Sequence, residues 1–131
     1  MVGPKVYLCY HGTDNEFESF NTALLGSSHG TAPINMAGFN FTDSEEVART
    51  FGKHVVGARI TMNKPVTINA NGKSYSDFKQ AINRRLEKID RSKHDGLIIH
   101  NYADAGKHGD DYIISNHYIP FNASQIKILY K

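Results

Sequence analysis

The fold of this chain is decided by the stretch Asn116-His117-Tyr118-Ile119-Pro120-Phe121-Asn122-Ala123-Ser124-Gln125-Ile126-Lys127. It predicts two short strands about a turn, because aromatic and β-branched residues come first and Asn122-Ala123-Ser124 supplies the bend. Pro120 removes a ladder donor, so we expect its strand to lie at a sheet edge or to have a bulge there. We expect that open edge, with His117 just before it, to bind a ligand.

Length and composition describe an ordinary globular domain. The 131 residues predict a single domain over 1–131, and hydrophobic and charged contents of 40% and 21% argue against disorder. The net charge of +2 argues against a strong nucleic-acid footprint. The basic cluster of Arg84, Arg85 and Lys88 is interleaved with Glu87 and Asp90, which indicates a solvated helix face.

The single cysteine, Cys9, excludes an internal disulfide. Its apolar neighbours predict a buried strand thiol rather than a nucleophile. No apolar run is long enough to span a membrane, and the N-terminus lacks the pattern of a signal peptide. We therefore expect a soluble, cytoplasmic protein with no membrane partner.

Short strands and a few helices are predicted along the rest of the chain. The strands are expected over Lys5–Tyr10, Gly38–Phe41, His54–Met62, Pro65–Ile68, Gly96–His100, Tyr112–Ser115 and Ile126–Tyr130. The helices are expected over Asp14–Leu24, from Thr42 to about Phe51, and over Ser74–Arg91. The loops are expected over Gly26–Ala37 and Asn101–Asp111. Strands do not alternate regularly with helices, so the predicted class is α+β with a mainly antiparallel sheet.

Local signals fix two of these helices. Thr42 and Glu45 form a predicted capping box before the first, and Gly52 is its predicted stop. Ser74 with Asp77 is a weaker box before the second. The second helix has its apolar residues at spacings of three and four, at Tyr75, Phe78, Ile82, Leu86 and Ile89.

Common catalytic motifs are missing from the sequence. It contains no Gly-rich phosphate loop, no Gly-x-Ser-x-Gly and no His-Glu-x-x-His. The seven histidines are scattered without paired ligand spacing, so we predict no metal site.

Three segments stand out together. The first is His11-Gly12-Thr13. It is either a turn with an exposed imidazole, or a site where the imidazole donates to a ligand and Gly12 lets that ligand approach the backbone. In the second, Gly38-Phe39-Asn40-Phe41 leads into a helix with Ala48 and Phe51, where Phe51 is either core or a ring face for a flat ligand. The third is the opening stretch.

In this order the three segments resemble the motifs of the ADP-ribosyltransferase fold, in the branch of the poly(ADP-ribose) polymerases and diphtheria toxin. That branch has His-Gly-Ser/Thr, then Gly-x-Tyr-Phe before a helix bearing a Tyr, then Asn-Glu-Tyr-Ile-Val-Tyr-Asp-x-x-Gln-Val. The ending Phe-Asn-Ala-Ser-Gln-Ile-Lys is also similar to small transferase-like domains of phages and mobile elements. The resemblance implies a mainly antiparallel split β-sheet with two or three helices.

The resemblance also implies a set of NAD-binding residues. Gly12 would present its backbone to the nicotinamide carboxamide, His11 would bond the adenosine ribose, and Phe51 would stack on the nicotinamide ring. Thr13 would support the turn.

The second segment departs from the family pattern at two positions. Asn40, beside Phe41, replaces an aromatic wall of the implied site. Ala48 falls where the polymerases have a Ser that bonds the carboxamide.

His117 holds the place of the family's Glu, which bonds the ribose 2′-OH near the oxocarbenium-like charge that develops when nicotinamide leaves. A neutral imidazole can accept that bond but cannot supply the negative charge. Three outcomes stay open. Asp110 or Asp111 substitutes as the acid, His117 acts as a base toward the acceptor, or NAD binds without efficient turnover.

The predicted function is therefore a mono-ADP-ribosyltransferase that uses NAD as substrate, needs no metal, and modifies a protein or another macromolecule. The alternatives are a degenerate module that binds NAD, another nucleotide or a partner, and an NAD glycohydrolase.

Overall fold

The computed structural model describes residues 5–13, 37–103 and 113–130. Its elements are β1 (Lys5–Thr13), β2 (Phe41–Thr42), α2 (Glu45–Phe51), β3 (His54–Met62), β4 (Pro65–Asn69), α3 (Tyr75–Lys88), β5 (Gly96–Tyr102), β6 (Ser115–Pro120), the 3-10 turn η2 (Ala123–Gln125) and β7 (Ile126–Tyr130). The helix expected over Asp14–Leu24 and most of the two expected loops, with Asp110 and Asp111, lie outside the described residues. No helix within the described ranges is long and apolar enough to cross a membrane.

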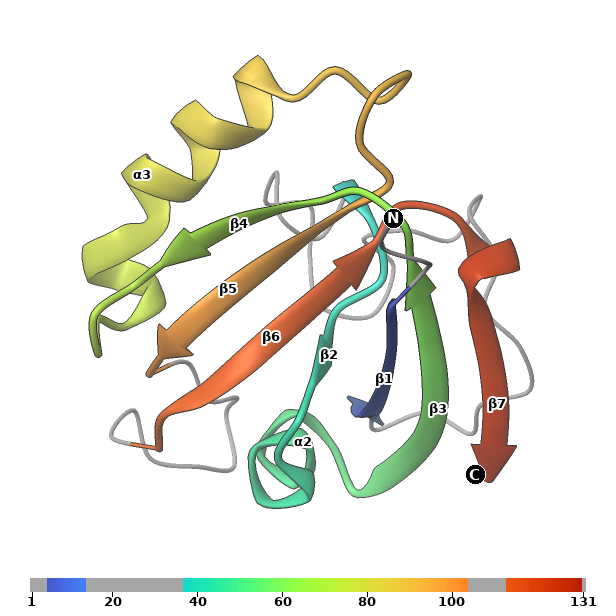
Figure 1. The fold of residues 1–131 in the computed structure, drawn as a ribbon. Helices are drawn as coiled ribbons and strands as arrows, with labels where there is room; N and C mark the ends of the chain where they lie inside the picture. Colours follow the sequence, from blue (N-terminus) through green and yellow to red (C-terminus); the bar gives the residue numbers. More distant parts are fainter. Residues whose placement is uncertain (1–4, 14–36, 104–112, 131) are drawn as a thin grey trace.

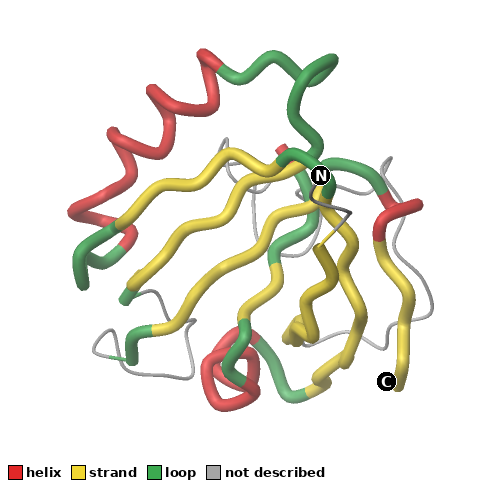
Figure 2. The backbone as a smooth tube through the Cα atoms, in the orientation of Figure 1, coloured by secondary structure: helices red, strands yellow, loops and turns green. Residues whose placement is uncertain are grey.

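The described strands form one seven-stranded sheet in the order β4-β5-β6-β2-β1-β3-β7 (Figure 1). The β4–β5 pair is parallel and the other five neighbouring pairs are antiparallel. Helix α3 runs alongside β4, and α2 lies at the end of β2 (Figure 2). The predicted α+β class with a mainly antiparallel sheet is confirmed.

The two parts of the sheet meet at β2, which has only two residues. Strand β2 pairs with β1 at one position, Thr42 opposite Tyr10, and with β6 at two, Phe41 opposite Tyr118 and Thr42 opposite His117. The prediction of a strand over Gly38–Phe41 is wrong in its bounds, because pairing begins only at Phe41. Only two residues separate the end of this short strand from the start of α2.

Strand β6 lies in the interior of the sheet, between β5 and β2, so the prediction of an edge strand at Pro120 is wrong. The register shift between β5 and β6 lies between Ile99 and Tyr102, so the predicted bulge at Pro120 is wrong as well. Pro120 is the last residue of β6, and its carbonyl accepts a 3.1 Å hydrogen bond from Phe39 N–H, before β2 begins. The N–H group that Pro120 lacks would therefore have pointed toward residues before β2, where no strand is present to accept a hydrogen bond.

Strand β1 is longer than predicted and less buried. It pairs with β3 along its whole length, from Lys5 opposite Met62 to Thr13 opposite His54, so His11-Gly12-Thr13 is strand and not turn. Cys9 is buried, as predicted, and burial raises the pKa of its thiol. Val6 and Leu8, however, are 53% and 64% exposed, which corrects the prediction of a buried strand there.

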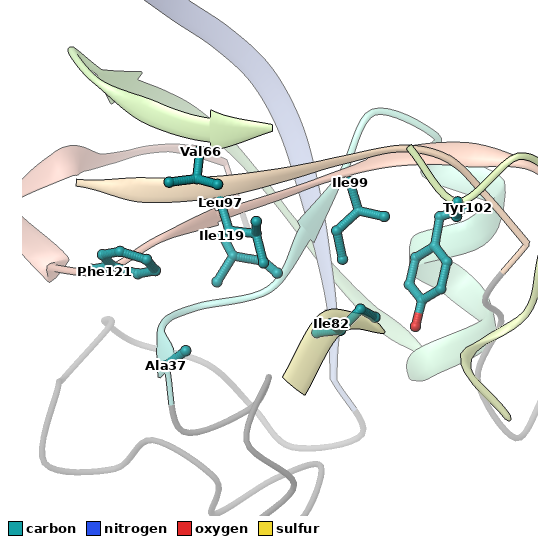
Figure 3. Packing of buried hydrophobic residues seen from close by; sticks show 9 residues of the cluster. Ala37, Val66, Ile82, Leu97, Ile99, Tyr102, Ile119 and Phe121 are labelled. Atoms are coloured by element: carbon teal, nitrogen blue, oxygen red, sulfur yellow. The ribbon is translucent and has the colours of Figure 1, made fainter. Parts of the chain in front are cut away.

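One hydrophobic cluster lies between α3 and the β4-β5-β6 part of the sheet (Figure 3). Ile82 is the fully buried residue of α3, and the other four residues of its predicted apolar stripe pack against the same cluster. Ser74 stands at the N-cap without a side-chain cap bond, and α3 ends at Lys88 rather than Arg91. The Arg91 guanidinium instead donates to Ala37 C=O and lies 4.4 Å from the centroid of Phe121.

A second cluster covers the opposite face of the sheet. Its buried members are Cys9, Phe39, Phe41, Ala58, Ile60, Met62, Ile98 and Tyr118. Side chains alternate along a strand, so the two clusters use alternate residues of β5 and β6. The sheet is thus apolar on both faces where these clusters lie.

An irregularity at Asn101 changes which face of the sheet Tyr102 occupies. β5 was predicted to end at His100, but it continues to Tyr102, which pairs with Ser115. Asn101 has a φ of 54°, and the register shifts between Ile99 and Tyr102. The extra residue breaks the two-residue alternation, so Tyr102 joins Ile99 on the face covered by α3.

We predict that Asn101→Val lowers the free energy of unfolding by about 1–3 kcal/mol, because a β-branched residue is strained at positive φ. Asn101→Gly, which removes the same side chain without that strain, should cost less than about 1 kcal/mol. Urea unfolding of the two variants measures the difference. Equal losses would show that the left-handed backbone at this position is not what constrains β5.

Candidate functional site

The candidate site forms around His117 in the middle of the sheet. His117 pairs with Thr42 of β2 on one side and with Ile99 of β5 on the other. Directly opposed residues of antiparallel strands share a face, so Tyr10, Thr42, His117 and Ile99 all lie on the face that α3 covers in part. His117 is only 4% exposed, so its imidazole is a buried polar group.

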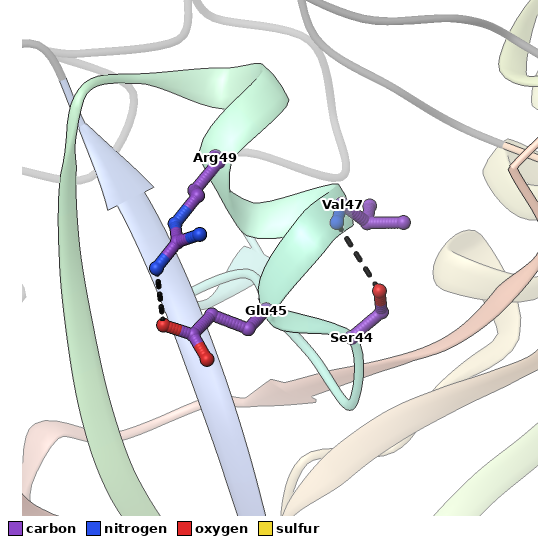
Figure 4. Close-up of polar contacts among 4 residues, drawn as sticks. All are labelled: Ser44, Glu45, Val47 and Arg49. Atoms are coloured by element: carbon purple, nitrogen blue, oxygen red, sulfur yellow. Dashed lines mark hydrogen bonds and ion pairs between the residues drawn. The ribbon is translucent and has the colours of Figure 1, made fainter.

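Helix α2 carries two of the predicted site residues. It starts at Glu45 after Ser44, whose hydroxyl accepts a 3.2 Å bond from Val47 N–H (Figure 4). The predicted capping box at Thr42 is therefore wrong, because Thr42 belongs to β2 and its hydroxyl accepts from Ser44 N–H. The helix ends at Phe51 and Gly52 follows, as predicted.

Gly12 brings α2 against the sheet. A Cβ atom at Gly12 would overlap the carbonyl oxygen of Ala48, and Ala48 is fully buried. Gly12 is two residues from Tyr10 along β1, so it lies on the same face as His117. Only a residue without a side chain lets the α2 backbone approach β1 this closely.

Two aromatic rings flank the His117 imidazole. The Tyr102 ring lies edge-on to it, with centroids 4.8 Å apart and planes at 76°. The Phe51 ring also meets it at an edge, at 6.5 Å and 79°. The His117 Nε2 atom is buried and has no hydrogen-bond partner among the described residues. His117 Nε2 is thus an unsatisfied polar atom among aromatic neighbours.

Burial controls the charge of His117. Desolvation lowers the pKa of the imidazole to about 3, so it is neutral at physiological pH. A neutral imidazole can donate from one ring nitrogen and accept at the other. The imidazole can therefore bond a hydroxyl or an amide, but it offers no charge to a ligand.

His11 lies on the other face of the sheet. It is next to Gly12 in β1, its Nδ1 lies 2.7 Å from the Asn40 carbonyl oxygen, and its ring is 5.6 Å from that of Phe41. Phe41 belongs to the second cluster. The structure therefore brings Gly12, Ala48, Phe51 and His117 together, and places His11, with the Asn40 carbonyl and the Phe41 ring, at the opposite face.

Thr13 is buried near the end of β1, opposite His54. The ligand contacts predicted for all of these residues stay predictions.

Residues that the sequence reasoning missed complete the cluster. No pattern in the sequence pointed to Tyr102, because its position in the site depends on the register shift at Asn101. Thr42 and Ser115 bond each other through their hydroxyls at 2.8 Å in a buried position. Ser115 could have been found, because it is two residues from His117 on the same strand and so shares its face. Within the described ranges, no three His, Cys, Asp or Glu side chains are grouped to hold a metal ion.

The chain matches a family described as ADP-ribosyltransferase in polyvalent proteins, over residues 4–130. No curated protein and no solved structure matches it. The family match covers nearly the whole chain, as the resemblance of the three segments predicted.

We predict that Gly12→Ala lowers the free energy of unfolding by about 1–3 kcal/mol, because the new methyl meets the backbone of α2 and the helix must shift. Gly57→Ala is the matched control in β3. Its Cβ meets the ring of Tyr130, which is 48% exposed and can rotate away. Chemical denaturation should show the larger loss for Gly12→Ala, and the reverse order would contradict the packing described for α2.

A further prediction concerns how the stability of the fold depends on pH. The folded pKa of His117, about 3, lies below the ordinary 6.5, so the unfolded chain binds the extra proton between these values. Protonation of this residue in the unfolded chain therefore lowers the stability of the fold as the pH falls from 6.5 toward 3, and this loss is absent above pH 6.5. Between pH 7 and pH 5 we expect the free energy of unfolding to fall by about 2 kcal/mol from this group.

The control variant is His117→Gln, whose side chain is uncharged at every pH of the experiment. Urea unfolding at pH 7, 6 and 5 should give a smaller acid loss in the variant. Identical pH profiles for the two proteins would show that the imidazole is not held neutral in the fold.

Proposed function

The chain belongs to the ADP-ribosyltransferase family of polyvalent proteins, and from this we propose that it is a mono-ADP-ribosyltransferase that cleaves NAD and transfers ADP-ribose to a macromolecular target. NAD is the substrate of such families. We further propose that the target is a protein.

The observation that carries the proposal is the packing of α2 on Gly12, which sets Phe51 beside His117. A flat nicotinamide ring would stack on Phe51, and backbone groups at Gly12 would bond its carboxamide. The buried Nε2 of His117 would gain the partner that it lacks by bonding a hydroxyl of the nearby ribose.

The reaction breaks the bond between the ribose C1′ and the nicotinamide nitrogen. Nicotinamide leaves with the bonding electrons, and positive charge develops at C1′ and the ring oxygen. A nucleophilic atom of the target then bonds C1′ and gives up its proton. With its pKa lowered to about 3, His117 is a weak base, so we assign it the role of holding the ribose by accepting a bond from a hydroxyl.

The electrostatics favour slow, single transfer. His117 supplies no negative charge to the developing cation, and losing one stabilising group of this kind typically costs about 10²–10³ in rate. Chain growth into poly(ADP-ribose) would need efficient repeated turnover, so we propose that one unit is transferred.

The same burial supports a second candidate function, a domain that binds NAD or another nucleotide without efficient turnover. A neutral His117 in an aromatic surrounding provides binding contacts but little transition-state stabilisation. The two candidates, and NAD hydrolysis, are separated by the fate of the ADP-ribose.

The test follows label from NAD carrying ³²P in its adenylate part. We expect label on protein, with release of nicotinamide, for the wild type. Phe51→Ala should lower the rate at least about tenfold, because the stacking surface for the leaving ring is lost. His94→Ala is the control, a partly exposed histidine whose Nδ1 contacts Lys64 C=O away from the site.

The other possible results of this assay distinguish the alternative functions. Free ADP-ribose without labelled protein indicates a glycohydrolase. NAD binding by calorimetry without nicotinamide release indicates the binding domain. Neither binding nor release would overturn the proposal, as would full activity of Phe51→Ala.

A further inference from the structure

We propose that the site around His117 binds the uncharged dihydronicotinamide ring of NADH about as well as the cationic ring of NAD, so that both redox forms of the dinucleotide occupy it. This inference rests on the proposed function, because it concerns the same site, and it names which ligands that site accepts.

Within the part of the chain that the structure describes, the groups that contact His117 are uncharged side chains. Its strand neighbours are Thr42 and Ile99, and its ring neighbours are Tyr102 and Phe51. The imidazole is itself neutral because it is buried. Among the described residues, a ligand ring bound here would therefore meet hydroxyls, an aliphatic side chain and aromatic rings, none of which carries a negative charge.

Two carboxylates of the β2–α2 segment are engaged elsewhere, and a third, Glu46, is exposed. The Asp43 carboxylate accepts 3.0 Å bonds from both the backbone N–H and the side-chain amide of Asn116, whose side chain lies on the opposite face from His117 by strand alternation. Glu45 pairs with Arg49 at 2.7 Å on the solvent side of α2. Neither acid is positioned to favour a positive ring over a neutral one.

The contacts that the site can make are shared by the two redox forms. The carboxamide, the ribose hydroxyls and the pyrophosphate are the same in NAD and NADH, and only the charge and shape of the ring differ. The buried Nε2 of His117 can bond a hydroxyl of either form. Stacking on Phe51 is open to both forms. The cationic ring gains an attraction to the aromatic face, which is stronger in a desolvated site, but it also loses its hydration on burial, so the two effects oppose each other.

The experiment compares dissociation constants for NADH, from its fluorescence, and for NAD, by displacement of NADH, at 10 °C and pH 7.5. The variants are His117→Glu and His117→Gln, which have side chains of nearly equal size and differ in charge. We expect the two constants of the wild type, and those of His117→Gln, to agree within about fivefold. His117→Glu should favour NAD at least about tenfold more, because an opposite charge within a few ångströms attracts the cationic ring.

A buried glutamate can stay protonated at neutral pH, so the comparison is repeated at pH 9. The inference is overturned by a wild-type preference for NAD above tenfold, by equal preferences of the Glu and Gln variants at both pH values, or by binding of neither dinucleotide at millimolar concentration. If His117→Glu does not fold, the wild-type ratio alone decides. If the protein transfers ADP-ribose from NAD but does not bind NADH, this inference is wrong and the proposed function stands. If it binds both forms but transfers nothing, this inference stands and the proposed function is wrong.

Discussion

The close approach of Gly12 to the Ala48 carbonyl is the constraint on which the site depends. The two-residue strand β2 delivers the chain into α2, but it does not determine how closely that helix sits on the sheet. The missing side chain at Gly12 determines this, and the distance decides whether Phe51, at the end of α2, reaches the imidazole of His117 on the neighbouring part of the sheet. A glycine read from the sequence as a turn residue is therefore a packing residue, inside a strand that continues for one more position.

His117 costs stability as the fold stands. A buried polar atom without a hydrogen bond typically costs about 1–3 kcal/mol, and an apolar residue would fit the aromatic surroundings formed by Tyr102 and Phe51. The second unusual feature of the site, the left-handed Asn101, points the same way, because the register shift there turns Tyr102 onto the face of His117. Unsatisfied buried groups and unusual backbone often mark functional sites, so we expect the imidazole to gain its missing partner from a ligand.

The elements that the sequence predicted well are those with a local cause. Helix α3 follows from its apolar spacing and β3 from its alternation, and Gln125 completes the predicted turn by accepting from Asn122 N–H and donating to Thr61 and Asp95 carbonyls. The errors share a tertiary cause. Pro120 was assigned to an edge because a proline removes a ladder donor, but that donor would point where β2 has not yet begun. Strand alternation also puts His11 on the opposite face of the sheet from His117, which the order of the motifs could not show, and the ligand contact of His11 stays a prediction.

The neutral site changes what controls the rate of an ADP-ribosyltransferase. Where a carboxylate stabilises the developing cation, departure of nicotinamide can run ahead of attack by the acceptor. In the transfer reaction that we propose, uncharged His117 cannot stabilise that charge. We therefore expect the electron pair of the incoming nucleophile to do so, with bond formation to the acceptor further advanced in the transition state. A strong nucleophile, well oriented at C1′, then contributes more than it would beside a carboxylate. In such a reaction, target recognition and chemistry would be coupled, because water, a weak and freely tumbling nucleophile, would gain least from this site.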